Sequence, residues 1–295
     1  QPSRSSDAEA KLNAVLVRDP LGPGSRLAGK VALISGGSGG MGSACARHLA
    51  AQGAAVALVA RQPEALNQAG ERVRALGAGP VLCCAGDVGC TQDASRVVAA
   101  TLARFGRIDF LLAFAGYSAD YPLISAAQPE PAQIQNLERI INVDLLGSAR
   151  LVFLVEPLLR AQGSGVIITL GNTPTLETQP TDLLYVVAKA GNKQLMEGLA
   201  AQHRALGLDG LRAYFLAPHF IYNRTTFEGM TPAQRTAADA DGWLDSDLHV
   251  APVVSWLLSG ALRRDDGASI RLNPHSAPQL FAEAGAAYPR FRGGE

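Results

Sequence analysis

The sequence has no uninterrupted apolar run of the roughly 18–20 residues that a membrane-spanning helix requires. Its first ten residues, QPSRSSDAEA, lack the apolar core of a secretory signal peptide. It also has no excess of positive charge, because 26 Lys and Arg residues balance 26 Asp and Glu residues. Proteins that bind nucleic acid through its phosphates normally carry a basic surplus. We therefore expect a cytoplasmic protein that binds neither membrane nor nucleic acid.

Cysteine is scarce and is not spaced for metal binding. The four cysteines, Cys45, Cys83, Cys84 and Cys90, form no paired C-x-x-C motif, and the five histidines lie elsewhere in the sequence. Cys83 and Cys84 fall in an apolar stretch, where cysteine behaves as a small buried hydrophobic residue. We expect no metal site and interpret the cysteines as core residues in a reducing cytoplasm.

From Lys30 onward, short apolar stretches alternate with longer helical ones. The short stretches predict strands at 31–35, 54–60, 81–86, 108–116, 166–170, 211–217 and 268–273. The longer stretches predict helices at 41–53, 63–76, 91–105, 131–160, 182–206 and 247–262. Strands and helices that alternate at this spacing indicate an α/β fold with a doubly wound parallel sheet. If the helix at 131–160 is interrupted anywhere, we expect the interruption near Pro157.

We expect a single domain at 28–275, between an N-terminal arm at 1–27 and a C-terminal tail at 276–295. The arm lacks sustained apolar periodicity and includes the turn-forming run DPLGPG. Within the domain, residues 218–247 mix polar residues with Phe220, Tyr222, Phe227, Met230 and Trp243. A long loop in a compact domain is usually a lid or a binding loop. We interpret 218–247 as a small cap over a binding site.

The segment SGGSGGMG, residues 35–42, lies between the first predicted strand and the first predicted helix. Glycines at such a turn let backbone N–H groups approach a pyrophosphate, and the N-terminus of the helix adds a favourable dipole. A flexible Gly-Ser linker would not lie between a buried strand and an amphipathic helix. The segment therefore predicts a dinucleotide-binding turn formed by Gly36, Ser38, Gly40, Met41 and Gly42.

Tyr185 and Lys189 are four residues apart in the predicted helix at 182–206, so their side chains share one face. A free phenol has a pKa near ~10, and an ammonium group beside it favours the phenolate. Such a pair can donate a proton to a carbonyl oxygen or accept one from an alcohol. The spacing alone is more typical of a core tyrosine beside a surface lysine. The glycine turn favours the chemical interpretation.

With these motifs in this order, residues 28–275 resemble a short-chain dehydrogenase/reductase, a Rossmann-fold family of NAD(P)-dependent enzymes. The turn matches the family pattern T-G-x-x-x-G-x-G at Ser35 (in place of Thr), Gly36, Gly40 and Gly42. Gly39 lets the same turn fit the T-G-x-x-G-x-x-G variant of the epimerase-type subfamily. Only 110 residues follow Tyr185 (295 − 185), so we favour the shorter, reductase-like subfamily.

Other segments resemble the family's cofactor-binding landmarks in the expected order. Asp87-Val88 matches the Asp-Val beside the adenine ring, and AFAG at 113–116 matches Asn-Asn-Ala-Gly only at its last two residues. APHFI at 217–221 resembles the Pro-Gly-x-Ile segment beside the nicotinamide, with His219 in place of Gly. The resemblance implies cofactor contacts from Asp87, Val88, Ala115, Gly116, Pro218 and Ile221, as well as from Tyr185 and Lys189.

Arg61 directly follows Ala60, the end of the second predicted strand. NAD-selective enzymes usually place Asp or Glu at this strand end to bind the ribose 2′-OH, whereas Arg accommodates a 2′-phosphate. Guanidinium–phosphate pairing is a charge-assisted bond with matching geometry. We therefore expect NADP. NAD remains the alternative, because Gly39 stands where many NADP users have a basic residue and Arg61 could be a solvated helix-cap residue.

The family's reductases place a Ser thirteen residues before the tyrosine, and position 172 (185 − 13) is Asn here. An amide NH₂ can donate a hydrogen bond to the substrate oxygen, provided that its carbonyl finds its own donor. Three interpretations stay open: Asn172 replaces the Ser, Thr173 substitutes for it, or the chain kept the cofactor fold and lost the chemistry. Retention of Tyr185, Lys189 and Asn142 together favours an active enzyme.

The family's scheme implies that Tyr185 protonates the substrate oxygen, while Lys189 holds the ribose hydroxyls and lowers the phenol pKa. Asn142, in the INVDLLG segment at 141–147, would fix a water that relays protons. We expect an NADPH-dependent carbonyl reductase or alcohol dehydrogenase for a moderately apolar ketone or alcohol. A homodimer or homotetramer through the helices at 131–160 and 182–206 is typical of the family. The alternatives are an NADP-binding protein with weak or no catalysis, and an epimerase or dehydratase with a tightly held cofactor.

Overall fold

The computed structural model describes residues 26–76, 79–117, 131–176, 183–222, 231–240, 243–262 and 267–286 of the 295-residue chain. Most of the expected arm, residues 287–295 of the expected tail, and residues 223–230 and 241–242 of the expected cap lie outside this part. Phe227 and Met230 of the cap are among them. The division into arm, domain and tail stays a prediction.

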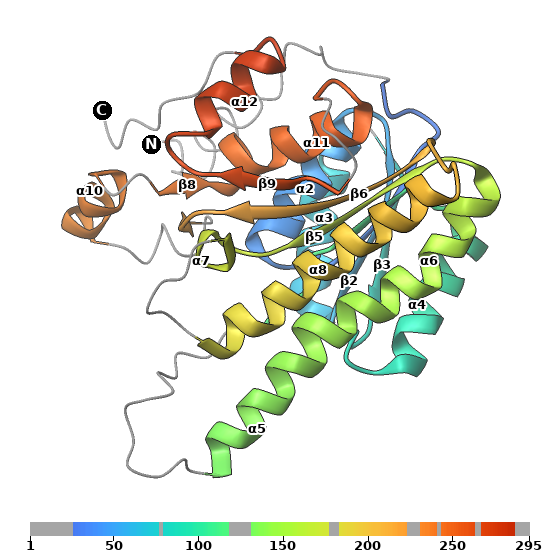
Figure 1. Ribbon diagram of the computed structural model, residues 1–295, viewed down its shortest axis with the longest axis horizontal. Helices are drawn as coiled ribbons and strands as arrows, with labels where there is room; N and C mark the ends of the chain where they lie inside the picture. The colour runs from blue at the N-terminus through green and yellow to red at the C-terminus, as the bar shows by residue number, and fades with distance from the viewer. Residues whose placement is uncertain are drawn as a thin grey trace.

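The described residues form a central sheet of seven parallel strands in the order β3-β2-β1-β4-β5-β6-β9 (Figure 1). The strands are β1 (Val31–Ser35), β2 (Ala55–Ala60), β3 (Val81–Ala85), β4 (Phe110–Ala113), β5 (Gly165–Leu170), β6 (Leu211–Pro218) and β9 (Ser269–Leu272). The central strands β1, β4 and β5 are buried along their whole length, which explains their near-continuous apolar sequences. The predicted doubly wound parallel sheet is confirmed.

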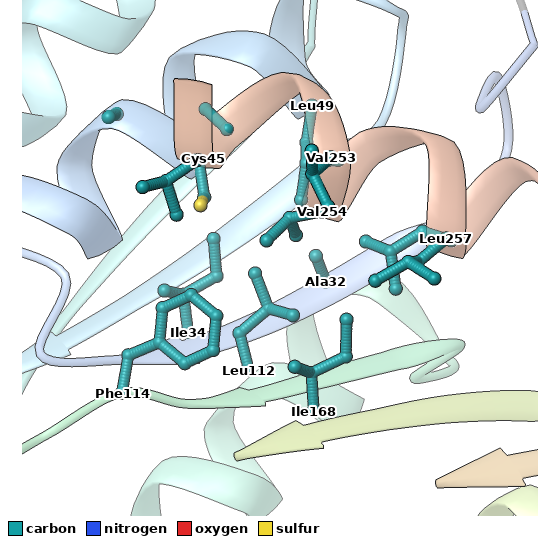
Figure 2. Close-up of a cluster of buried hydrophobic side chains, with 14 of the residues drawn as sticks. Ala32, Ile34, Cys45, Leu49, Leu112, Phe114, Ile168, Val253, Val254 and Leu257 are labelled. Atoms are coloured by element: carbon teal, nitrogen blue, oxygen red, sulfur yellow. The ribbon is translucent and has the colours of Figure 1, made fainter. Parts of the chain in front are cut away.

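Helices cover both faces of this sheet (Figure 1). One face carries α2 (Gly40–Ala51), α3 (Pro63–Arg74), α11 (Ala251–Ser259) and α12 (Ala277–Glu283). The other face carries α4 (Thr91–Phe105), α6 (Ser148–Gln162) and α8 (Leu183–Ala205). Figure 2 shows the first layer, in which side chains of α2 and α11 lie over those of β1, β4 and β5. Each fully buried Leu or Ile side chain here stabilises the fold by about 1.5–3 kcal/mol relative to exposure, so the two layers hold the strand ends in place.

The helix predicted at 131–160 is divided into α5 (Pro131–Ile140), the π-helix η1 (Ile141–Gly147) and α6. The expectation of a break near Pro157 was wrong, because Pro157 lies inside α6 without ending it. The carbonyl that Pro157 leaves without a donor belongs to Phe153, whose side chain is 74% exposed, on a side of the helix that water reaches. In η1, by contrast, side chains bind the backbone: Asn192 Nδ2 and Ser148 Oγ donate to the Asp144 carbonyl at 2.8 and 2.9 Å. Such π-turns often occur at functional sites.

The strand order reverses between β1 and β4, so the connections that follow these strands lead to opposite faces of the sheet. In open α/β sheets, ligands bind at this opening, beside the carboxyl ends of the strands. Here the Ala115 N–H donates to the Ser35 hydroxyl at 3.1 Å and joins the two strand ends. The glycine turn and the segment after β4 therefore border the same opening.

Part of the expected cap is described beside this edge. β7 (Ile221–Tyr222) pairs in parallel with β8 (Leu244–Asp245), and η2 (Ser246–Val250) and α10 (Pro232–Ala240) complete the described part. The rings of Phe220 and Trp243 stack with their centroids 5.4 Å apart. Among the described residues, no helix combines the length and the apolar character needed to cross a bilayer.

Candidate active site

The turn between β1 and α2 is packed too tightly for any residue but glycine at two positions. Gly36 has a φ of +69°, in the left-handed region, and a Cβ there would lie 2.7 Å from the Phe114 carbonyl oxygen. A Cβ on Gly42 would overlap the carbonyl oxygen of Gly36. The absence of side chains lets the turn fold against the end of β4 and leaves its backbone open toward a ligand.

The N-terminus of α2 has the chemistry of a phosphate site. The helix begins at Gly40 after the N-cap Gly39, which offers no side-chain cap, and its first turn contains no acidic residue. The N–H groups of this turn, including those of Met41 and Gly42, therefore lie at a positive helix end without a side-chain acceptor. Ser38 is half-buried beside them. A pyrophosphate would supply the acceptors that this turn lacks, so the residues fit a dinucleotide.

Asp87 and Val88 lie in the turn after β3, which borders the same edge of the sheet. The Asp87 N–H donates to Asp93 Oδ2 at 2.9 Å, and the Gly89 N–H donates to Asp87 Oδ1 at 2.8 Å. The first bond holds the backbone of Asp87 and the second holds its carboxylate, while Val88 is buried in the core. Arg61 follows the neighbouring strand β2, and its exposed side chain makes no hydrogen bond or ion pair with the part of the chain that the structure describes.

Tyr185 and Lys189 both lie on α8, as predicted, and a third group joins them. Lys189 Nζ is 5.0 Å from the centroid of the Tyr185 ring and 3.0 Å from Oδ2 of Asp144, a residue of η1. The lysine and aspartate side chains are 3% and 0% exposed, whereas Tyr185 is half-buried and can meet a ligand. Burial lowers the pKa of Lys189, but the charges of Tyr185 and Asp144 and the hydrogen bonds to them outweigh it, so this pKa is raised.

The segment that follows β4 contacts this ion pair. The Tyr117 N–H donates to Asp144 Oδ1 at 2.6 Å. Gly116 lies so close to the pair that a Cβ added to it would be 3.1 Å from Asp144 Oδ2 and 3.4 Å from Lys189 Nζ. Ala115 is tied to β1 through Ser35, as described above. The structure thus brings Ala115 and Gly116 together with Lys189.

Asn142 lies away from the lysine. Its Nδ2 donates to the Gly89 carbonyl at 3.1 Å, and its Oδ1 accepts from Arg150 at 3.0 Å. Asn142 therefore joins η1 to the turn after β3, and the side chain of η1 that contacts Lys189 is that of Asp144. The role of Asn142 in fixing a relay water stays a prediction.

Asn172 and Thr173 open the short helix α7 (Thr173–Leu176), and α7 contacts α8. Asn172 is half-buried, and its side-chain carbonyl accepts a hydrogen bond from the Thr175 hydroxyl. The carbonyl thus has the donor that its use in place of Ser requires, and the NH₂ group is left to donate elsewhere. Thr173 is 4% exposed, and its hydroxyl has no hydrogen-bond partner among the described residues. The geometry favours Asn172 over Thr173 as the group that meets a substrate.

Pro218 and Ile221 lie at and just beyond the carboxyl end of β6. Pro218 ends β6, where it pairs with Leu272 of β9, and Ile221 begins β7 in the cap. Between them, the rings of His219 and Phe220 meet edge to face with centroids 4.9 Å apart. These residues stand where the cap leaves the sheet.

The comparisons with known proteins agree with this geometry. Residues 30–229 match the family model described as short chain dehydrogenase. The chain belongs to the short-chain dehydrogenase family. Members of this family are NAD(P)-dependent oxidoreductases with a Rossmann fold.

Relatives and solved structures of this family align with most of the chain. An 11-beta-hydroxysteroid dehydrogenase A of Sesamum indicum is 30% identical over 229 residues, 77% of this chain and 62% of the relative. The chain spans between half and two thirds of the length of this protein and of a similar one from Arabidopsis thaliana. The crystal structure of levodione reductase has a TM-score of 0.73 and 26% identity, covering 86% of this chain and 98% of that one. An NAD⁺-bound xylitol dehydrogenase shares the fold, with a TM-score of 0.71, 22% identity and coverage of 84% and 99%.

Proposed function

We propose that this short-chain dehydrogenase is an NADPH-dependent carbonyl reductase, and in reverse an alcohol dehydrogenase, for a moderately apolar ketone or alcohol. The observation that carries the proposal is the half-buried phenol of Tyr185 beside the buried ammonium of Lys189. The pair lies on α8, and Lys189 contacts the segment that follows β4 at the edge where β1 also ends. A proton donor at the nucleotide-binding edge of such a sheet suits carbonyl chemistry.

The residues around the glycine turn suit a dinucleotide. Backbone N–H groups of the first turn of α2 would hold its pyrophosphate, and Asp87 and Val88 would border its adenine. When bound, the nicotinamide supplies or accepts the hydride. Arg61 supports NADP over NAD, because no acidic residue ends β2 and the guanidinium is exposed for a 2′-phosphate. NAD remains the competing cofactor, because the xylitol dehydrogenase that shares this fold binds NAD⁺.

The side chains divide the acid–base work. The Tyr185 hydroxyl donates its proton to the oxygen of the carbonyl and takes it back from an alcohol. Asn172 donates a hydrogen bond from its NH₂ group to the same oxygen, where negative charge develops. Lys189 keeps a positive charge beside the phenol, because Asp144 offsets the cost of burying it. None of these steps requires a metal ion.

The cap supports an apolar substrate. Phe220 is 54% exposed and stacks on Trp243, so an aromatic surface lies beside the carboxyl end of β6. Aromatic side chains bury large apolar areas on binding, so such a surface favours an apolar ligand. The names of the steroid- and levodione-converting relatives fit this class of substrate.

We further propose that the chain forms a homodimer or homotetramer through α5, η1, α6 and α8. Helix α8 contacts both η1 and α5. Large apolar side chains are exposed on these elements and on α6, and they support the proposal: Ile134, Leu137, Leu146, Phe153, Leu183 and Val187. Figure 1 shows α8 beside the rod formed by α5 and α6. A large exposed apolar patch is typical of a protein interface.

The proposal is tested by consumption of NADPH against a panel of apolar ketones, with NADH alongside. Tyr185→Phe removes the proton donor but keeps the ring, so turnover should fall below detection while the Kd for NADPH stays within about twofold. Tyr214→Phe is the matched control, because Tyr214 is fully buried in β6 and its loss should leave turnover intact.

Three results would contradict the proposal. Turnover by the Tyr185→Phe variant at the wild-type rate would remove the assigned proton donor. Tight NADPH binding without oxidation of any ketone would indicate a non-catalytic binding protein. A cofactor that copurifies and is not consumed during turnover would indicate an epimerase or dehydratase.

A further inference from the structure

Asp144 is a fully buried carboxylate whose two oxygens have separate partners. Oδ2 lies 3.0 Å from Lys189 Nζ, and Oδ1 accepts from the Tyr117 N–H at 2.6 Å. Its backbone carbonyl is held as well, by Asn192 on α8 and Ser148 on α6. Both the side chain and the main chain of Asp144 are therefore fixed by the elements that surround Lys189, which is the arrangement that a positioning residue needs.

The charge of Asp144 acts on the same proton that Tyr185 transfers. A lone ammonium group beside a phenol favours the phenolate, because the positive charge stabilises the negative one. A carboxylate 3.0 Å from that ammonium makes the pair neutral, and its field at the phenol is correspondingly weaker. In the buried surroundings of this site, solvent does little to screen either charge.

We propose that Asp144 is a positioning residue that keeps Lys189 charged and weakens its pull on the Tyr185 proton. The phenol then remains a proton donor into more alkaline solution, and reduction persists there. This inference rests on the proposed function. It adds that the charge of Asp144 sets the range of pH over which the enzyme reduces a ketone.

Few other ionisable groups face this cluster from the elements packed against α8. Tyr117 lies at the end of β4, and Arg139 of α5 lies 4.4 Å from the centroid of its ring. On α6, Glu156 faces His203 at 3.5 Å, near the far end of α8, and on β6 Arg212 lies near the amino end of the strand. β5 and α7 contain no ionisable side chain. Within the described residues, Asp144 is thus the only carboxylate in contact with Lys189.

The first experiment is the pH dependence of turnover in Asp144→Asn. The basic limb of ketone reduction should move to lower pH by about one unit or more, and the acidic limb of alcohol oxidation should move with it. The cause is the unopposed ammonium, which promotes the phenolate at a lower pH than the neutral ion pair does. A merely structural role would lower the rate without moving either limb.

Asp109→Asn is the matched control. Asp109 is also buried and paired with a lysine, Lys30, at 3.1 Å, but it precedes β4 at the opposite edge of the sheet. Its loss should lower stability and leave the pH profile in place. Superimposable profiles for the Asp144→Asn variant and the wild-type protein would overturn the proposal.

The second experiment needs no substrate and no substitution at Asp144. The sequence contains only four lysines, Lys11, Lys30, Lys189 and Lys193, so ¹³Cε-labelled lysine gives few NMR signals, assignable with Lys→Arg variants at positions 11, 30 and 193. In the wild-type protein, Lys189 should titrate above the ordinary lysine value of 10.5. A Lys189 signal that titrates below this value would overturn the proposal. Wild-type protein without turnover would overturn the proposed function alone, because this titration reads the ion pair directly.

Discussion

The Thr175 hydroxyl donates a hydrogen bond to the side-chain carbonyl of Asn172. An amide has two ends, and only its NH₂ group can donate to a developing oxyanion. Because Thr175 occupies the carbonyl, the NH₂ group of Asn172 remains available to donate. In the proposed mechanism, this NH₂ group donates to the substrate oxygen.

Removal of either partner should reduce catalysis by different amounts. Asn172→Ala deletes the donor itself, so kcat should fall by about 10²–10³-fold. Thr175→Val removes only the bond that orients the amide, so the fall should be smaller, about tenfold, with the Kd for NADPH unchanged. Thr101→Val is the control, because its hydroxyl bonds the Val97 carbonyl within α4, away from the site. Equal activity of the wild-type and Asn172→Ala proteins would exclude the assigned donor.

Replacement of Arg61 should change the choice of cofactor. Arg61→Ala removes a charge-assisted bond to a 2′-phosphate, so the Kd for NADPH should rise by about 10–100-fold and that for NADH should stay nearly constant. Fluorescence titration with both cofactors measures this, with Arg104→Ala on α4 as the surface-arginine control. An equal loss for both cofactors, or none, would argue against an NADP-binding role.

Asp245 should make the protein less stable as the pH rises from 4 to 7. Burial, reinforced by the charge of Asp247, raises the pKa of Asp245 to about 6 from its ordinary value of 3.8. The folded state therefore binds this proton more tightly, and the resulting stability is complete below pH ~3.8 and is lost as the pH rises through ~6. The loss reaches up to about 3 kcal/mol.

Asp245→Asn should remove this slope, because an amide Oδ1 can still accept from the N–H groups of Asp247 and Leu248 at the start of η2. In urea unfolding at several pH values, the free energy of unfolding of the variant should increase relative to that of the wild-type protein between pH 4.5 and 7.5. Asp209→Asn, at an exposed aspartate, should show no such gain. A constant difference across this range would contradict the assignment to Asp245.

A charge on the exposed face of α6 should separate the subunits of a homo-oligomer. Phe153 is 74% exposed, and Phe153→Glu would bury a carboxylate in an apolar interface. The variant should sediment as a monomer at concentrations at which the wild-type protein is a dimer or tetramer. Leu206→Glu is the control, since Leu206 is 66% exposed beyond the end of α8. Sedimentation of the wild-type protein as a monomer would contradict the proposed homo-oligomer.

Much of the fold follows from local sequence, and the exceptions have physical causes. The strand at 31–35 and the helix at 91–105 were predicted at the bounds that the structure gives. The strand is a nearly continuous apolar run, the helix has a clear apolar period, and a glycine follows each of them. The π-helix at 141–147 had no such signal. It is formed by partners distant in sequence, since Asn192 lies 48 residues from the carbonyl that it binds.

The candidate site divides along the same line. The glycine turn and the Tyr185–Lys189 spacing are local patterns that sequence can display. The position of Asp144 depends on its contacts with Tyr117 and Lys189, which lie in other segments of the chain, so no local pattern predicts it. One signal was present: a single aspartate among the apolar residues of INVDLLG requires a buried partner.

The π-turn of η1 contains more backbone per turn than an α-helix, so it sets the rotation of α5 relative to α6. Deletion of one residue between 141 and 147 would change this wider turn into a regular α-helix. The carboxylate of Asp144 would then lose its present position beside α8. Single-residue insertions and deletions should therefore be excluded from this stretch among functional homologues, even though it lies within a helix where substitutions at the surface are well tolerated.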